Sequence, residues 1–245
     1  MKQRIAICGR NLDELRTMLA GYPVTVVDTN PDLVISHGGD GALLGAEREF
    51  PGVPKFPLRD FAHNYPCPDH DPEVMLCQAL TGQLKRYEVT KIQASVNGKT
   101  VIGLNDICLH RQNLASAVRF RLYLNDEIYA NQVVGDGLVA ATTFGSTGYY
   151  RSITNSIFQT GLGLAFSNTT DPIDHMVLKE SCVIKLRILR GPAILVVDND
   201  PREIQLHADD EVVLKKADSK AVIFGLDVLR CRECFRLRQK FSEPN

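Results

Sequence analysis

The sequence predicts an α/β domain with a parallel sheet, followed by a β-rich, sandwich-like domain. In the first part, short apolar strands alternate with segments of helical periodicity, which is typical of a parallel sheet flanked by helices. From about Tyr87 onward, β-rich segments follow one another between turn residues, which is typical of a sandwich or layered sheet. We therefore expect an α/β domain over residues 1–87 and a β-rich domain over 88–225, with a final segment, 226–245, that joins the first domain.

Each element of the first domain is predicted by its own pattern. Leu12, Leu15 and Leu19 recur at helical spacing, and Asn11 stands where an N-cap is expected. The stretch 51–72 holds six of the twelve prolines, so we expect it to be mostly irregular. The expected elements are strands over 4–9, 24–28 and 32–36, helices over 11–22 and 42–50, a short strand within 54–58 and a helical segment over 71–87.

The second domain is predicted from turn signals and alternation. Asn97-Gly98 is a strong hairpin signal within the apolar segment 91–111. Val118, Phe120, Leu122 and Leu124 alternate with polar or amphipathic residues, which places them on one face of a strand. Further strands are expected over 182–189, 193–199, 211–216 and 221–226.

Composition and charge limit the classes of protein to which the chain can belong. The chain of 245 residues is 44% hydrophobic and 23% charged, which is enough for a buried core. A formal net charge of −1 gives no overall attraction to nucleic acid or membranes, and we expect the basic stretch 229–240 to be a solvated face. The sequence has no apolar run of bilayer length and no signal-peptide pattern, so we expect a cytoplasmic protein without nucleic-acid or membrane partners.

Two groups of residues have part of the spacing of a metal site. They are His63, Cys67 and His70 in a proline-rich stretch, and Cys231 with Cys234 near the end of the chain. A structural zinc normally needs four ligands, so we expect no metal held by protein side chains. The seven cysteines are scattered, which does not favour a disulfide framework.

The stretch SHGGDGALLGAERE, residues 36–49, surrounds Asp40 with Gly38, Gly39 and Gly41. Glycines let backbone N–H groups approach an anion closely, and the helix expected after the loop adds the positive end of its dipole. The loop is neither a Walker loop nor GxGxxG. Beside a phosphate, Asp40 could bind Mg²⁺ or accept a proton from an attacking hydroxyl, but it could equally be a turn residue that caps the helix.

Two later stretches also have the composition of a nucleotide site. Residues 136–152 combine glycines and hydroxyl side chains, which let a ligand approach the backbone, with tyrosines that can stack or hydrogen-bond. Asn105 and Asp106 interrupt an apolar strand, and such a pair can bind a base edge and ribose hydroxyls. Taken alone, the first stretch is also consistent with a polar turn and the second with a bulge or strand end.

These three stretches, in this order, resemble the NAD kinase family. The pattern of that family is a GGDG loop, an Asn-Glu pair on a strand, and a DGL segment that leads to TPTGSTAY. The matching segments here are Gly38-Gly39-Asp40-Gly41, Asn105-Asp106, and Asp136-Gly137-Leu138 leading to Gly145-Ser146-Thr147-Gly148-Tyr149. Lipid and sphingoid kinases share GGDG but do not usually carry the other two stretches.

The resemblance implies a Rossmann-like first domain and a kinase that converts NAD to NADP by phosphorylating its adenosine-ribose 2′-hydroxyl. ATP, or polyphosphate in some members, would lie over the glycine loop with Mg²⁺, NAD would bind between the domains, and Asp40 would take or orient the proton of the hydroxyl. Such enzymes are commonly homodimers or homotetramers. By the same resemblance, the binding residues would be Gly38, Gly39 and Gly41 for ATP, Asn105, Thr147, Gly148 and Ser152 for adenosine, and Asp106, Asp136 and Tyr149 for the ribose and nicotinamide portions of NAD.

The match to the family pattern has departures. Ala42 stands in place of the usual threonine, and Asp106 in place of the usual glutamate. Residues 54–70 replace a glycine-rich segment, the double glycine after the tyrosine is absent, and VDND at 197–200 stands where the family often has an Asp-Gly turn. Two alternatives therefore stay open: a related GGDG kinase acting on a lipid or another nucleoside hydroxyl, and a non-catalytic nucleotide-binding homologue.

Overall fold

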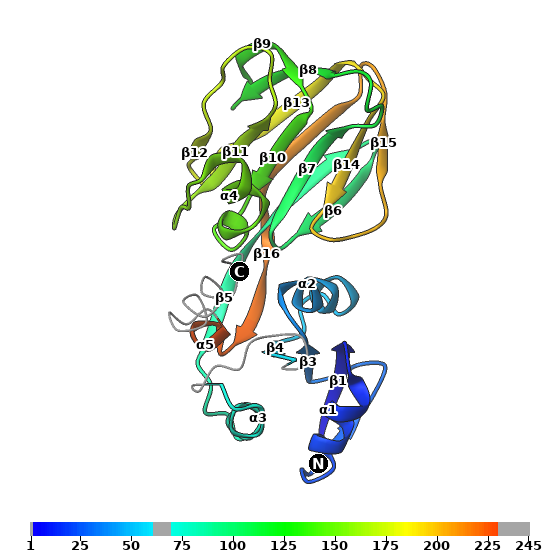
Figure 1. The fold of residues 1–245 in the computed structure, drawn as a ribbon, viewed down its shortest axis with the longest axis vertical. Helices are drawn as coiled ribbons and strands as arrows, with labels where there is room; N and C mark the ends of the chain where they lie inside the picture. Colours follow the sequence, from blue (N-terminus) through cyan, green and yellow to red (C-terminus); the bar gives the residue numbers. More distant parts are fainter. Residues whose placement is uncertain (1, 61–69, 230–245) are drawn as a thin grey trace, which may run out of the picture. The chain divides into compact units, whose positions relative to one another are not determined.

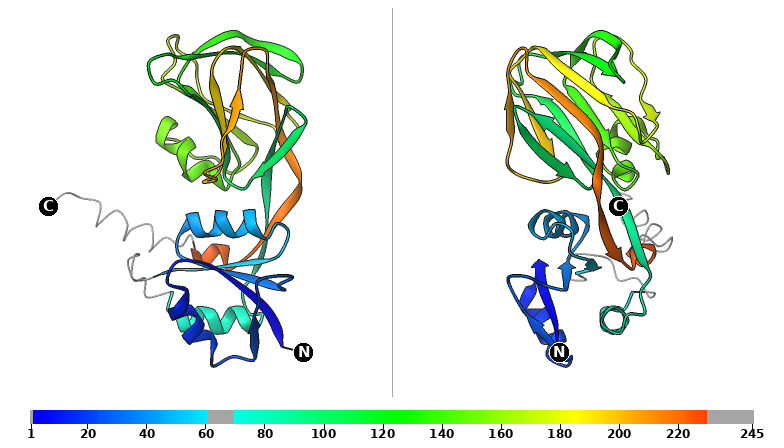
Figure 2. Two further views of the ribbon diagram at one scale, coloured as in Figure 1. Left: turned by 90° about the vertical axis from the view of Figure 1, so that its right-hand side faces the viewer. Right: turned by 180° about the vertical axis from the view of Figure 1, so that it is seen from behind.

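The computed structural model of the chain describes residues 2–60 and 70–229 (Figure 1). The chain divides into two compact units, one formed by residues 1–89 with the chain from Ala221 onward and the other by residues 90–220. The division falls within two long strands that pair with each other, β5 (Arg86–Val96) and β16 (Glu211–Phe224) (Figure 2). Within the described ranges, no helix has the length and apolar content needed to cross a bilayer.

The first unit is built on parallel strands. β1 (Gln3–Gly9), β2 (Val24–Val26), β3 (Leu33–His37) and β4 (Lys55–Leu58) form the order β2-β1-β3-β4, and the end of β16 continues it in parallel with β4. Helices α1 (Leu12–Leu19) and α3 (Pro72–Leu80) pack on one face of the sheet, where the core includes Leu15, Ile35, Phe56 and Leu76. Helix α2 (Asp40–Glu49) packs on the other face, through a smaller cluster of Ala6, Val34 and Ala46.

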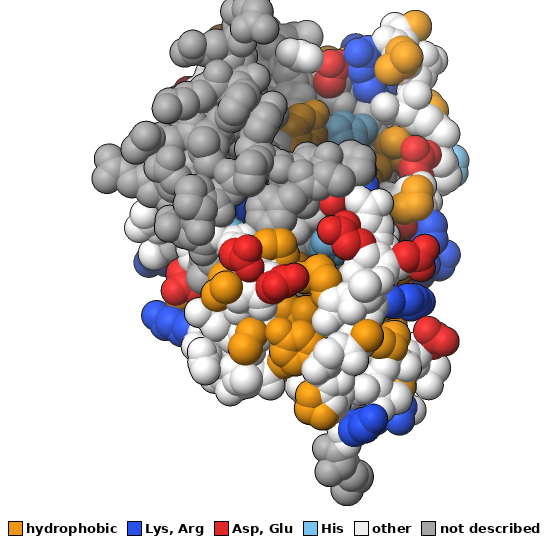
Figure 3. Space-filling model, turned by 60° about the horizontal axis from the view of Figure 1, so that its bottom comes forward, with side chains coloured by type: hydrophobic (Ala, Val, Ile, Leu, Met, Phe, Trp, Pro, Cys, Tyr) orange, Lys and Arg blue, Asp and Glu red, His pale blue; other side chains and the backbone are white. Residues whose placement is uncertain are grey.

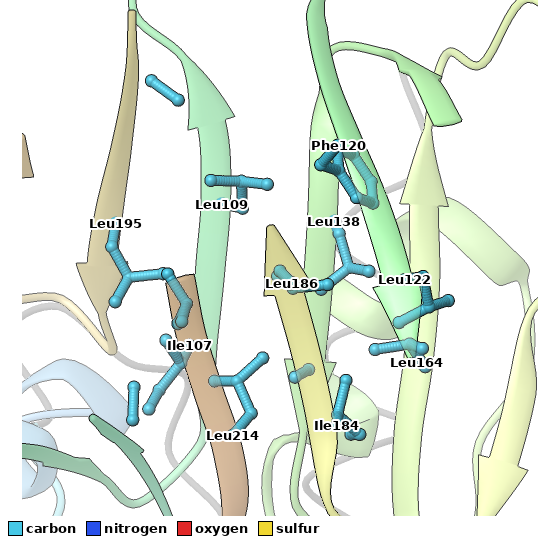
Figure 4. Close-up of a cluster of buried hydrophobic side chains, with 14 of the residues drawn as sticks. Ile107, Leu109, Phe120, Leu122, Leu138, Leu164, Ile184, Leu186, Leu195 and Leu214 are labelled. Carbon is cyan, nitrogen blue, oxygen red and sulfur yellow. The ribbon is translucent and has the colours of Figure 1, made fainter. Parts of the chain in front are cut away.

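The second unit is a sandwich of two sheets. One sheet is antiparallel, with the order β12-β11-β10-β7-β14-β15, and the other contains β16, β13, β8 and β9 together with β5 and β6. Apolar side chains of both sheets meet between them, as Leu138 does with Leu186 and Ile107 with Leu214 (Figure 4). The remaining elements are β6 (Lys99–Gly103), β7 (Asp106–Arg111), β8 (Val118–Leu124), β9 (Glu127–Gly135), β10 (Gly137–Ala141), the 3-10 helix η1 (Gly145–Thr147), α4 (Tyr149–Thr154), β11 (Leu162–Ser167), β12 (Met176–Leu178), β13 (Ile184–Arg190), β14 (Ala193–Val197), β15 (Ile204–Leu206) and α5 (Leu226–Leu229).

The predicted fold class is confirmed, and three element boundaries are corrected. The helix expected over 71–87 ends at Leu80. It ends there because Gly82 adopts a left-handed conformation, with φ 71°, and the amide of the next residue, Gln83, donates to the Gln78 carbonyl at 2.9 Å. The strands expected over 211–216 and 221–226 are one strand, because β16 pairs with β4, β13 and β5 and these ladders hold it extended. The helix expected over 42–50 begins two residues earlier, at Asp40.

Candidate functional site

The parallel strands of the first unit contain a switch point between β1 and β3. Within the sheet, β2 lies next to β1 on one side and β3 lies next to β1 on the other side. The chain therefore reverses its direction across the sheet between β2 and β3. In open α/β sheets, ligands bind outside the carboxyl ends of the strands at such a point. The loops that leave β1 and β3 there are residues 10–11 and 38–39.

Hydrogen bonds tie the loop after β1 to His37, the last residue of β3. The Arg10 amide donates to the His37 carbonyl at 2.9 Å, and Nδ1 of the buried His37 ring donates to the Arg10 carbonyl at 2.7 Å. Asn11 occupies the predicted N-cap position of α1, but it has φ 49° and its side chain makes no capping hydrogen bond. Its amide instead donates to Oδ2 of Asp60 at 3.0 Å, which anchors the loop to the segment that follows β4.

The glycine loop leads directly into α2. Gly38 has φ 144°, a conformation that other residues rarely adopt, and Gly39 is the N-cap. Asp40 is the first helical residue, so the alternative that its side chain caps the helix fails. The Asp40 carboxylate is exposed and makes no hydrogen bond or ion pair with the described residues, and Gly41 follows it in the first turn.

In the second unit, the bend between β6 and β7 has a fully paired backbone. The amides of Leu104, Asn105 and Asp106 donate to the Asp198 carboxylate at 2.8, 2.7 and 3.1 Å. The Leu104 carbonyl accepts from Oγ1 of Thr142 at 2.7 Å, and the Asn105 carbonyl accepts from the Thr142 amide at 2.8 Å. The Asp106 carbonyl accepts from the Asp198 amide at 2.9 Å, so all six backbone polar groups have partners.

The side chain of Asn105 contrasts with its backbone. Its Oδ1 is buried and has no hydrogen-bond partner in the described structure. Its Nδ2 lies 3.8 Å from the place that a Cβ on Gly148 would take, and Gly145 packs directly on the Asn105 backbone. The structure therefore brings Asn105 together with the predicted Gly145–Gly148 segment and leaves its buried acceptor without a partner.

Asp106 is buried beside a second carboxylate. Its side chain is 5% exposed, and Oδ1 accepts a weak hydrogen bond from Sγ of Cys108 at 3.6 Å. Burial and the charge of Asp198 raise the pKa of Asp106 to about 7. Near neutral pH a large part of this carboxyl is therefore protonated and able to donate a hydrogen bond.

Four of the predicted NAD-binding residues lie together on η1 and α4. Thr147, Gly148, Tyr149 and Ser152 are exposed, and Tyr149 stacks on His110 with ring centroids 5.8 Å apart and an interplanar angle of 29°. The Ser152 hydroxyl donates to the Tyr149 carbonyl at 2.7 Å. This arrangement offers an aromatic face and small residues to a flat ligand.

Asp136 is engaged by protein groups. Its Oδ1 pairs with Nε of Arg111 at 2.8 Å, and its Oδ2 accepts from Nδ2 of Asn168 at 2.8 Å. Burial lowers the pKa of the neighbouring His110, and the Asp136 charge opposes that shift. The Asp136 carboxylate thus connects β7 to the loops that follow β9 and β11.

Sequence reasoning did not predict the role of two residues of this region. Asp198 and Thr142 hold the Asn105 bend, and the signal that could have found Asp198 is the polar VDND segment directly after a buried strand. Of the candidate metal ligands, His63, Cys67, Cys231 and Cys234 lie outside the described residues. Within the described ranges, no three His, Cys, Asp or Glu side chains are placed to hold a metal ion.

The surface of the described residues carries mixed charge on the face shown in Figure 3. Basic side chains lie there in several separate places, interspersed with acidic and hydrophobic ones. This agrees with a formal net charge of −1 for the chain.

Comparison with known proteins identifies the family. The model of the ATP-NAD kinase C-terminal domain matches residues 104–225. The chain is 25% identical over 231 residues to a NAD kinase of Clostridium perfringens, covering 89% of this chain and 83% of that protein. It is 28% identical over 204 residues to a bifunctional NADP phosphatase/NAD kinase of Methanocaldococcus jannaschii, covering 77% of this chain but only 35% of that longer protein.

Two solved structures share the fold. A NAD kinase from Archaeoglobus fulgidus in complex with ATP has a TM-score of 0.75 at 20% identity, covering 97% of each chain. A yeast NADH kinase complexed with NADH has a TM-score of 0.81 at 17% identity, covering 100% of this chain and 89% of that one. Together with the sequence motifs, the family model and the curated relatives show that the chain belongs to the NAD kinase family.

Proposed function

We propose that this chain transfers a phosphoryl group from ATP to the 2′-hydroxyl of the adenosine ribose of NAD, giving NADP. The observation that carries the proposal is the exposed, unengaged carboxylate of Asp40 in the first turn of α2, at the switch point of the parallel sheet. Membership of the NAD kinase family gives the class of reaction, and the position of Asp40 gives the residue that would assist it.

The chemistry fits this position. A ribose hydroxyl is a poor nucleophile at neutral pH, and a carboxylate within reach can accept its proton as the new P–O bond forms. The amides of Gly39 and of the first turn of α2, with the positive end of the helix dipole, would hold phosphate oxygens. Phosphoryl transfer otherwise depends mainly on positioning and on neutralising charge.

Mg²⁺ fits the groups present. Mg²⁺ binds phosphate oxygens together with water, so the ion would be carried by ATP, with the exposed Asp40 carboxylate in the first turn of α2. The bound ion would supply neutralisation of phosphate charge. A control without divalent cations tests this requirement directly.

The second unit would bind NAD. The unpartnered Oδ1 of Asn105 would accept a hydrogen bond from an N–H donor of the nucleotide. Thr147, Gly148 and Ser152 would line the same adenosine region, and Asp106, Asp136 and Tyr149 would serve the ribose and nicotinamide portions.

We also propose a cytoplasmic homodimer or homotetramer without nucleic-acid or membrane partners, and light scattering of the pure protein tests its assembly.

Replacing Asp40 by asparagine tests the catalytic proposal. The purified protein is incubated with ATP, Mg²⁺ and NAD, and NADP is detected with an NADP-specific dehydrogenase. Loss of a general base should lower kcat by about 10²–10⁴-fold and change ATP affinity much less. Asp13→Asn is a matched control, because Asp13 is also an exposed carboxylate in the first turn of a helix.

Two outcomes would contradict the proposal. No NADP above a boiled control would reject the reaction, and parallel reactions with NADH, other nucleosides and lipids would then separate the two alternatives. An Asp40→Asn variant with the parent turnover would reject the role of Asp40 while leaving the reaction in place.

A further inference from the structure

We propose that Asp198 is a positioning residue of the nucleotide site: its carboxylate fixes the backbone of residues 104–106 and so holds the Asn105 side chain in place for its ligand. The identity of that ligand, NAD, rests on the proposed function. Asp198 lies just after β14 and is separated by 92 to 94 residues from the three amides that it binds.

The geometry is specific to a carboxylate. Three consecutive amides converge on one side chain, with Oδ2 accepting from Leu104 and Oδ1 accepting from both Asn105 and Asp106. Only an ionised carboxylate offers acceptor sites for all three without presenting a donor of its own. Asp198 has φ 49°, and its own amide closes the arrangement by donating to the Asp106 carbonyl.

The carbonyl groups of the same bend are also held by hydrogen bonds. Thr142 donates to the carbonyls of Leu104 and Asn105, and its hydroxyl accepts from the Gly145 amide at 3.1 Å. Asp198 and Thr142 together leave the backbone of the bend no unpaired polar group. The unpaired atom is Oδ1 of the Asn105 side chain, which is buried.

These observations point to a ligand rather than to stability alone. A buried acceptor without a partner is unfavourable until a donor reaches it. Asp198 also places a charge beside the buried Asp106 carboxyl, an arrangement that a neutral capping residue would avoid. Groups held in an unfavourable but fixed arrangement are typical of binding sites.

The test compares Asp198→Asn with Asp200→Asn in the full chain. Asp200 lies in the same turn, and its carboxylate accepts hydrogen bonds from the backbone amide and the guanidinium of Arg202 at 2.7–3.1 Å. In the ligand-free protein, Asp198→Asn should speed hydrogen exchange of the amides of residues 104–106. It should also weaken NAD binding and raise KM for NAD by about tenfold or more, with KM for ATP little changed.

A double variant separates positioning from general support of the fold. If Asp198 acts through Asn105, adding Asp198→Asn to Asn105→Ala should weaken NAD binding no further. Additive losses, or equal losses in KM for NAD and for ATP, would overturn the proposal. Asp198→Glu keeps the charge with one more methylene and should give an intermediate loss, which provides a second test where the asparagine variant folds poorly.

Failure of the Asp198 proposal can be told apart from failure of the proposed function. If the parent protein forms no NADP and binds no NAD, the proposed function fails. Exchange of the amides of residues 104–106 then still decides whether Asp198 holds the bend, and unchanged exchange in Asp198→Asn overturns this inference by itself.

Discussion

Replacing Gly145 by alanine tests the packing between η1 and the Asn105 bend. A Cβ at position 145 would lie 2.1 Å from the Asn105 carbonyl oxygen, 2.6 Å from its carbonyl carbon and 2.8 Å from its Cα. All three atoms belong to backbone whose hydrogen bonds are already satisfied, so none can rotate away. The bend or η1 must therefore move by about 1 Å to restore ordinary contact distances.

The size of the effect follows from that displacement. Overpacking of this kind costs about 1–3 kcal/mol, which corresponds to a melting temperature lower by roughly 2–10 °C for a chain of this length. The displaced segment carries Asn105, and a misplacement of about 1 Å at a binding group can reduce turnover about 100-fold. We therefore expect Gly145→Ala to lower kcat/KM for NAD by about two orders of magnitude.

The assay is the NADP-coupled reaction, run with a thermal melt of each variant. Gly21→Ala is the control, because a Cβ at position 21, outside the candidate site, would meet no heavy atom within 4 Å. This control should remain close to the parent protein in activity and melting temperature. Parent-like values for Gly145→Ala, or equal losses in the two variants, would refute the reasoning.

Two further predictions concern buried charge. Because burial and Asp198 raise the pKa of Asp106 from 3.8 to about 7, the folded state keeps a proton that the unfolded state loses, and stability from this group falls as pH rises from 3.8 to about 7. Asp106→Asn should flatten that part of the curve of melting temperature against pH, and an unchanged slope would contradict the assignment. Lys55 and Glu47 form a buried ion pair between β4 and α2, so Lys55→Met should cost about 3–5 kcal/mol in urea unfolding. Adding Glu47→Leu should recover most of that loss, and a double variant as unstable as Lys55→Met would count against this account.

Local patterns carried much of the fold prediction. The alternation of Val118, Phe120 and Leu122 gives three buried side chains on β8, and Asn97-Gly98 forms the turn between β5 and β6 with both residues at positive φ. These signals depend on residues a few positions apart, which is the range that periodicity reads. The continuity of β16 depends instead on its pairing with strands far away in the sequence, so the local pattern predicts a break over 217–220 that the structure does not have.

The residues of the candidate site also fall into those predicted from local motifs and those whose role appears only in the structure. The glycine loop, Asn105 and the residues of η1 and α4 were predicted because each belongs to a compact motif. Thr142 lies in the stretch 136–152 and Asp198 in the VDND segment, but their role as partners of the Asn105 bend becomes visible only when the sandwich brings them to it. Residues that hold a site from a distance are the part that single-sequence reasoning cannot reach.

The structure also separates the predicted binding residues by how free they are to meet a ligand. Asp136 is engaged by Arg111 and Asn168, and Asp106 is buried. Asn105, in contrast, keeps a buried acceptor without a partner in the described structure, and Tyr149 is 40% exposed. Direct recognition of a nucleotide should therefore depend more on Asn105 and Tyr149, while the two carboxylates shape the electrostatics and geometry around them. Substitution of either carboxylate would then act mainly through the shape of the site, as the positioning role of Asp198 also requires.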